Sequence, residues 1–399
     1  MSLLKYIVAI FLLISIVACS TDSNEPENVI PEMEMSQEEE DMDDEDTNEE
    51  EEEENVFEGD IVLTNQDEVD SFGSNNYTLI TGNLSIIYDE NNPSGPEITS
   101  LASLNTIRSI GGNMTLEDIN DLQNLGGLEN IENIFGNIRI IGSTSLQNLN
   151  GIANTNFSNT LWLQSLPSIE NIPNFDQITS LQILRINSTA LQALNAFNNV
   201  TEITGEISIS GNNALDVISG FQRLEVAGNF RILGNSVLDT ISGFTDLHTI
   251  NGDIALGGNL VSNLNYLQNI QSGADSIVIS GDNSSETFDL SGLQNLVSCK
   301  FLTFSNINIT SLESLESLSE IIGLEISSCP NLTSLDGLEN LGPNLNEPST
   351  IATFLQNENL TDFCAITNLV VNSPNIIFTT VFNGFDPTEQ DIILGNCSM

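Results

Sequence analysis

The chain has 399 residues, of which 57 are aspartate or glutamate and 7 are lysine or arginine, so its formal net charge at pH 7 is -50. Proteins that bind nucleic acids need a basic surface that neutralises phosphates, and we therefore expect no nucleic-acid partner. The acid is unevenly spread, because nineteen of the 57 acidic residues lie between Asp22 and Glu54, a stretch without lysine or arginine.

Residues 1–18, MSLLKYIVAIFLLISIVA, combine a single lysine with an apolar run and then small residues. This pattern is typical of a secretory signal peptide rather than of a membrane span. The ending IVAC resembles the lipobox of bacterial lipoproteins, which implies that Cys19 becomes the lipid-modified first residue of the mature chain. Ser20, in place of an aspartate that retains such proteins in the inner membrane, implies an outer-membrane location. The alternative is an ordinary signal peptide followed by an unmodified cysteine.

Residues 19–55 are predicted to be a charged tether, whose densest part reads EEEDMDDEDTNEEEEEE. Such a tract repels itself and has little apolar surface to bury, so we expect it to be disordered. With a lipid on Cys19, it would hold a folded domain away from a membrane surface. Binding of cations or of a basic partner by this tract is the alternative.

An internal repeat begins at about residue 59 and is the strongest signal in the sequence. Four-residue cores alternate polar and apolar residues, which predicts a short strand with one buried face. A unit of about 23 residues cannot bury that face alone, whereas stacked units share one core and one parallel sheet. We therefore predict an all-β solenoid. The cores begin at Asn83, Asn113, Asn137, Thr160, Ile183, Glu206, Asn229, Asp253, Ser276, Phe301 and Gly323.

The stretch EISISGNNALDVISGF looks like a leucine-rich repeat, with Asn212 at the ladder position and Asn235 and Asn259 at the same place in later units. An asparagine there can satisfy backbone groups of the adjoining turn. The phrases LTSLDGLENL and INGDIAL more closely resemble the receptor L-domain, over about residues 59–341. This resemblance implies a right-handed parallel β-helix of leucine-rich turns, found in receptor ectodomains and in surface lipoproteins of the Bacteroidota.

The solenoid is expected to span residues 56–348 and to include an amino-terminal cap at 61–77, with a carboxy-terminal capping segment at 349–399. Four cysteines remain besides Cys19, and an even number in an exported chain suggests two disulfides. We predict the pairs nearest in sequence. Metal binding by the cysteines is disfavoured, since the chain has no CxxC motif and His248 is its only histidine. The predicted disulfides are Cys364–Cys397 and Cys299–Cys329.

The third position of each core faces outward, and stacking places these positions in one column. Three of the six cationic residues that follow the signal peptide, Arg139, Arg185 and Arg231, fall in this column, and the first two flank Trp162, the only tryptophan. A structural interpretation is cation–π contact, with Glu206 neutralising two of the arginines. The functional hypothesis is a site for an anionic or sugar ligand, because guanidinium groups suit carboxylate or sulfate and indole suits a sugar face.

The sequence thus predicts a lipid-anchored outer-membrane protein displayed at the cell surface, which acts as a non-catalytic binding or adhesion module without cofactor or metal. Its partner would be an extracellular protein or a polysaccharide. The motif CSTDSNEPEN, only thinly acidic after the cysteine, supports surface export weakly. Two alternatives stay open. The first is a purely structural surface protein, and the second a polysaccharide-active β-helix enzyme that uses carboxylates such as Glu206 and Asp253.

Overall fold

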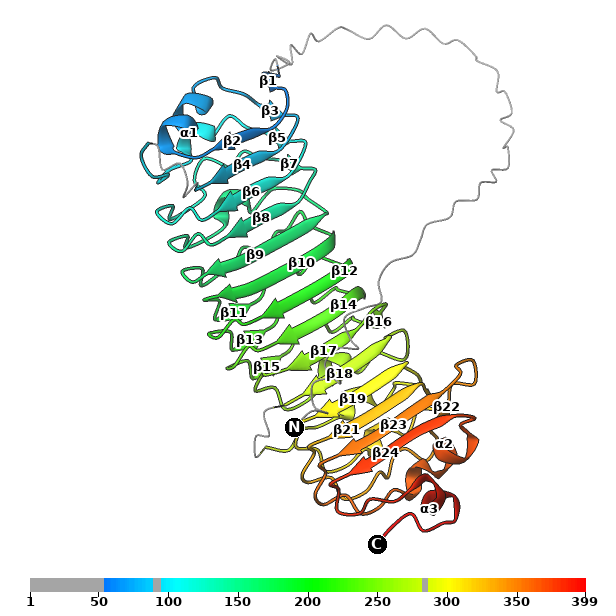
Figure 1. Ribbon diagram of the computed structural model, residues 1–399. Coiled ribbons are helices and arrows are strands. Elements are labelled where there is room, and N and C mark those ends of the chain that lie inside the picture. Colours follow the sequence, from blue (N-terminus) through cyan, green and yellow to red (C-terminus); the bar gives the residue numbers. More distant parts are fainter. Residues whose placement is uncertain (1–53, 89–94, 282–285) are drawn as a thin grey trace, which may run out of the picture. The chain divides into compact units, whose positions relative to one another are not determined.

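The computed structural model describes residues 54–88, 95–281 and 286–399, and Figure 1 shows them as a stack of short parallel strands. The proposed signal peptide, Cys19 and nearly all of the proposed tether lie outside the described residues and stay predictions. In the part of the chain that is described, no helix is long and apolar enough to cross a membrane.

One 15-stranded parallel sheet runs through the whole stack, in the described residues, and each turn contributes its strand next to that of the preceding turn. The stack has about 14 turns of about 23 residues, so the predicted all-β solenoid is confirmed. The strands of this sheet, in spatial order, are β2 (Ile61–Leu63), β4 (Leu84–Ile87), β6 (Met114–Glu117), β8 (Ile138–Ile141), β9 (Thr160–Leu166), β10 (Ser180–Thr189), β12 (Glu202–Ser210), β14 (Val226–Leu233), β17 (Ile254–Gly257), β18 (Ser276–Ser280), β19 (Phe301–Ser305), β21 (Gly323–Ser327), β23 (Thr350–Leu355) and β24 (Ile376–Val381), with β16 (Thr249–Ile250) beside β14.

Smaller parallel sheets and single 3-10 turns complete the walls of the solenoid. The short strands are β1 (Val56–Phe57), β3 (Leu79–Ile80), β5 (Ser109–Ile110) and β7 (Asn133–Ile134); β11 (Ala193–Leu194), β13 (Val217–Ile218) and β15 (Thr240–Ile241); and β20 (Glu320–Ile321) and β22 (Gly342–Pro343). The 3-10 turns are η1 (Ala102–Leu104), η2 (Asn150–Ile152), η3 (Asn265–Leu267), η4 (Ser291–Leu293), η5 (Glu313–Leu315) and η6 (Cys364–Ile366).

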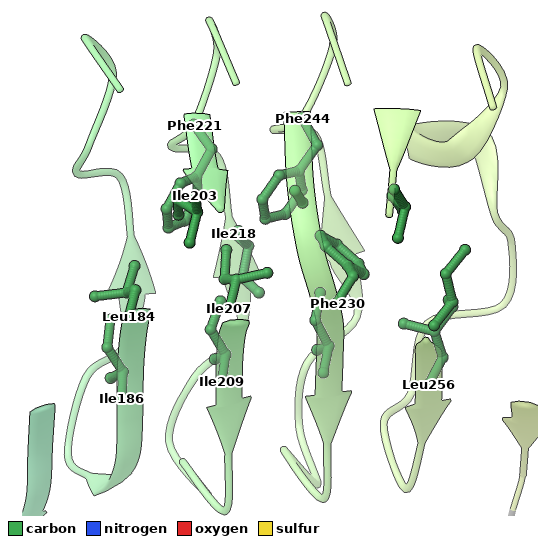
Figure 2. Close-up of a cluster of buried hydrophobic side chains, with 14 of the residues drawn as sticks. Leu184, Ile186, Ile203, Ile207, Ile209, Ile218, Phe221, Phe230, Phe244 and Leu256 are labelled. Atoms are coloured by element: carbon green, nitrogen blue, oxygen red, sulfur yellow. The ribbon is translucent and has the colours of Figure 1, made fainter. Parts of the chain in front are cut away.

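The core is a set of apolar columns that run along the stack. Strands β10 and β12 pair so that Leu184 lies opposite Ile207 and Ile186 opposite Ile209, and all four side chains are fully buried (Figure 2). Because the side chains of a strand alternate between its faces, the residues between them point outward. The repeat therefore separates a fixed core from a variable outer face.

A column of phenylalanine rings fills one corner of the core. The ring centroids of Phe197 and Phe221 are 5.4 Å apart, and those of Phe221 and Phe244 are 4.8 Å apart. Figure 2 shows Phe221 and Phe244 on neighbouring turns. These three residues have φ between 59° and 63°, a left-handed conformation that is costly for a bulky residue. Complete burial of stacked rings offsets this cost, since each ring removes a large apolar area from water.

The predicted asparagine ladder is present at the end of the strands. The side-chain amide of Asn212 donates to the Ile186 carbonyl at 2.9 Å, and that of Asn235 donates to the Ile209 carbonyl at 3.0 Å. The Oδ1 atom of Asn235 accepts from the backbone N–H of Asn212, and Asn259 does the same for Asn235, both at 3.0 Å. Each asparagine thus satisfies buried backbone groups of neighbouring turns.

The two ends of the stack are built differently. At the amino-terminal end, helix α1 (Gln66–Gly73) is capped by the side chain of Asn65 and buries Val69 and Phe72, within the predicted cap. At the other end, helices α2 (Thr367–Asn372) and α3 (Glu389–Ile393) belong to the last turns. Strands β23 and β24 extend the same sheet beyond residue 348, and the boundary proposed there stays a prediction.

One of the two predicted disulfides is present in the structure and the other is not. Cys364 and Cys397 form a disulfide with a Cα–Cα distance of 4.9 Å. Cys299 and Cys329 are buried free thiols, so that pairing was wrong. The reason is register: Phe301 pairs with Gly323 and Ser305 with Ser327, which places Cys299 before one five-residue strand and Cys329 after its neighbour. A strand of this length spans about 16 Å, whereas a disulfide needs Cα atoms within about 7 Å.

Candidate functional site

The outer face of β8, β9, β10 and β14 carries the arginines and the tryptophan that the sequence singled out. Arg139 pairs in register with Trp162, and Trp162 with Arg185. Ser208 of β12 comes next in the column and pairs with Arg231. The predicted alignment in one column is therefore confirmed. We call Arg139, Trp162, Arg185 and Arg231 the Arg–Trp stripe.

Trp162 lies between two guanidinium groups. The Cζ atom of Arg139 is 4.8 Å from the centroid of the indole ring, and that of Arg185 is 5.4 Å away on the next strand. Each contact of this kind contributes about 0.5–1 kcal/mol at an exposed site. The indole Nε1 donates to Oε1 of Gln164 at 3.0 Å, which fixes the ring on its strand. The large aromatic side chain can occupy an outward position because the guanidinium groups of both neighbouring strands lie against its ring.

Glu206 forms ion pairs with two of the three arginines. Its Oε2 accepts from Nε and Nη2 of Arg185 at 3.1 and 2.6 Å, and its Oε1 lies 3.6 Å from Nη1 of Arg231. The carboxylate side chain is only 14% exposed, so water screens these contacts weakly. The structural interpretation of the stripe is therefore correct for Arg185 and Arg231.

Arg139 is different, because no carboxylate holds it closely. The nearest one, Glu117, has its Oε1 3.9 Å from Nη2 of Arg139, which is beyond hydrogen-bond distance. The Nε atom of Arg139 is buried and has no hydrogen-bond partner among the described residues, while the side chain as a whole is 43% exposed. Three guanidinium groups against two carboxylates leave the site with a formal charge of +1. Arg139 is therefore the arginine of the stripe with the longest distance to a carboxylate.

The carboxylates considered for catalysis, Glu206 and Asp253, lie two turns apart. Asn229 of the intervening strand lies between them, and Glu206 forms ion pairs with Arg185 and Arg231. His248 is exposed, with Nδ1 2.9 Å from the Asp246 carbonyl, as expected for a turn residue. The described residues contain no group of three or more histidine, cysteine or acidic side chains placed to hold a metal ion.

Two residues of the site were not predicted from the sequence. Gln164 was detectable, since it follows Trp162 by two residues and must share its face. Glu117 was harder to find, because it lies diagonally from Arg139, and such a contact depends on side-chain conformation rather than on spacing. Comparison with protein-family models and with curated proteins found no match for the chain, so the resemblance to the receptor L-domain stays a prediction.

Proposed function

We propose that this protein is a lipid-anchored binding or adhesion module of the outer-membrane surface, without catalytic activity, and that the Arg–Trp stripe is its ligand site. The ligand is an extracellular polysaccharide or protein that presents carboxylate or sulfate groups. The proposal of anchoring rests on the lipobox-like segment that ends at Cys19, and the proposal of binding rests on the outer face of the sheet.

The observation that carries the proposal is the environment of Arg139 beside Trp162. On a chain with 57 acidic and 7 basic residues, the stripe has a surplus of positive charge next to a partly exposed indole. An acid group can bind the guanidinium of Arg139, whose nearest carboxylate is 3.9 Å away, while a sugar ring lies against the aromatic edge. Arg185 then acts as a positioning residue, because Glu206 holds it against the other face of the ring.

Trp162 fluorescence tests the proposal directly, since no other tryptophan contributes to the signal. The full chain is titrated with polygalacturonate, chondroitin sulfate and neutral dextran. We expect a saturable change with an acidic polymer and none with dextran. Arg139→Ala should weaken the binding about ten- to hundredfold, the effect of removing hydrogen bonds to a charged group.

Arg223→Ala is the matched control, because this exposed arginine has the same charge but lies outside the stripe. It should change the affinity by less than about twofold. Equal losses in the two variants would show non-specific attraction to a polyanion. No response to any acidic polymer would turn the search toward protein ligands, which are tested with the same pair of variants.

A purely structural role is the second candidate, and the ion pairs of Glu206 with Arg185 and Arg231 favour it. On this hypothesis the stripe only stabilises the middle of the sheet. Arg139→Ala would then lower the free energy of unfolding without altering any interaction of the protein.

A further inference from the structure

The last strand of the large sheet, β24, has a free edge. In the described residues it pairs with β23 alone. The backbone N–H groups of Thr350 and Gln356 donate to the carbonyls of Asn375 and Val381, at 3.2 and 2.9 Å. In a parallel ladder, successive residues bond to alternate sides, so the backbone groups of the even-numbered residues in β24 point away from β23. Those residues are Ile376, Phe378 and Thr380.

The strand itself carries none of the side chains that normally prevent strands from adding to a sheet, although the Thr380 hydroxyl donates to the Pro387 carbonyl of the following segment at 2.8 Å. Lysine, proline, inward charges and bulges serve that purpose in natural sheets. The six residues of β24, IIFTTV, contain none of these side chains, and their pairing with β23 is continuous from Ile376 to Val381. Ile377 is 56% exposed and Phe382, directly after the strand, is 72% exposed. An uncharged, partly apolar edge of six residues is long enough to template another strand.

The charges around the edge indicate what kind of strand fits. Lys300 is the last cationic residue in the sequence, so every charged side chain beyond it is acidic. Glu358 and Phe382 line the same surface hollow at the carboxyl end of β24. A partner segment with lysine or arginine between apolar residues would satisfy both features. A second copy of this chain would instead bring acidic ends together.

We propose that the free edge of β24 is a docking surface for an extended segment of another protein, one that alternates apolar residues with lysine or arginine. The segment adds a strand to the sheet through the backbone groups of Ile376, Phe378 and Thr380. Its apolar side chains cover Ile377 and Phe382, and a cationic side chain reaches Glu358. This surface does not depend on the Arg–Trp stripe, which lies on earlier turns.

A short capped peptide of alternating valine and lysine is the probe, and the same peptide with glutamate for lysine is its control. The full chain is titrated with each peptide by calorimetry, and amide hydrogen exchange is followed across residues 376–381. We expect binding of the lysine peptide alone, with slower exchange in β24. Ile377→Lys should weaken it at least about tenfold, because it places a charge on the edge strand.

Ile351→Lys is the matched control. Ile351 pairs with Ile377 in the same outward column, but it lies on β23, the strand next to the edge strand. It introduces the same charge and should change the affinity by less than about twofold. Glu358→Gln should weaken binding of the lysine peptide without unfolding the exposed site. No binding of the lysine peptide, equal binding of both peptides, or equal effects of the two lysine variants would overturn the proposal. Binding without slower amide exchange in β24, or self-association of the chain through this edge, would overturn it as well.

Discussion

Replacing Asn235 by alanine tests how the turns are held together at the end of the strands. Asn235 is fully buried, and its side chain makes four hydrogen bonds. It accepts from the backbone N–H and the amide of Asn212, and it donates to the Ile209 carbonyl and to Oδ1 of Asn259, over 3.0–3.1 Å. At about 1 kcal/mol for each bond, Asn235→Ala should lower the free energy of unfolding by about 4 kcal/mol.

Equilibrium unfolding in urea, followed by circular dichroism, measures this loss. The matched control is Asn213→Ala, because Asn213 is exposed and its side chain accepts one bond, from Ser236. The control should change stability by less than about 0.5 kcal/mol. Asn235→Leu fills the side-chain space without adding a charge and removes all four hydrogen bonds, so a large loss there excludes an explanation based only on a cavity. A loss below about 1 kcal/mol in both Asn235 variants would refute the argument that the ladder holds this corner.

Three further predictions concern the outer face and the cysteines. Glu206→Gln should raise the affinity of the stripe for a sulfated polysaccharide, measured by fluorescence titration, because Arg185 and Arg231 lose their carboxylate partner. It should also lower the free energy of unfolding in urea by about 1–2 kcal/mol, a value reduced because the arginines are partly exposed. Reduction of the Cys364–Cys397 disulfide, which spans 33 residues, should cost about 3–4 kcal/mol, measured by unfolding with and without reductant. Burial raises the pKa of Cys299 to about 12 and that of Cys329 to about 11. Their stabilising effect is therefore complete below the ordinary thiol pKa of 9.0 and is lost as pH rises above it, because the unfolded chain releases these protons first; Cys299→Ala should flatten the fall in unfolding free energy between pH 9.0 and about 12.

The spacing of the repeat predicted the fold because each unit satisfies two conditions at once. The alternating residues give one buried face, and the nearly constant unit length brings equivalent residues such as Leu184 and Ile207 into register. The phenylalanine column was not predictable in this way, since Phe221 and Phe244 adopt a backbone conformation that their residue type disfavours. Here tertiary packing overrides local preference.

The wrong cysteine pair shows the limit of distance along the chain. Cys299 and Cys329 are 30 residues apart, which is close to one turn plus the length of a strand. A separation of one turn alone would have stacked them, as it stacks Asn212 on Asn235. The extra residues move one thiol to the far end of the neighbouring strand, so counting positions within the unit would have excluded the bridge.

Counting positions within the repeat unit also shows which contacts of the Arg–Trp stripe the sequence could predict. Position in the unit fixes that Arg139, Trp162 and Arg185 are neighbours, because a residue cannot leave its column without moving the core residues beside it. It does not fix which acid each arginine selects, since Glu206 and Glu117 reach their partners diagonally. This choice separates Arg185, which is hydrogen-bonded to a carboxylate, from Arg139, whose nearest carboxylate is 3.9 Å away. In a solenoid the outer residues can vary at little cost to the core, so the charge pairing on the outer face, rather than the fold, determines what the sheet can bind.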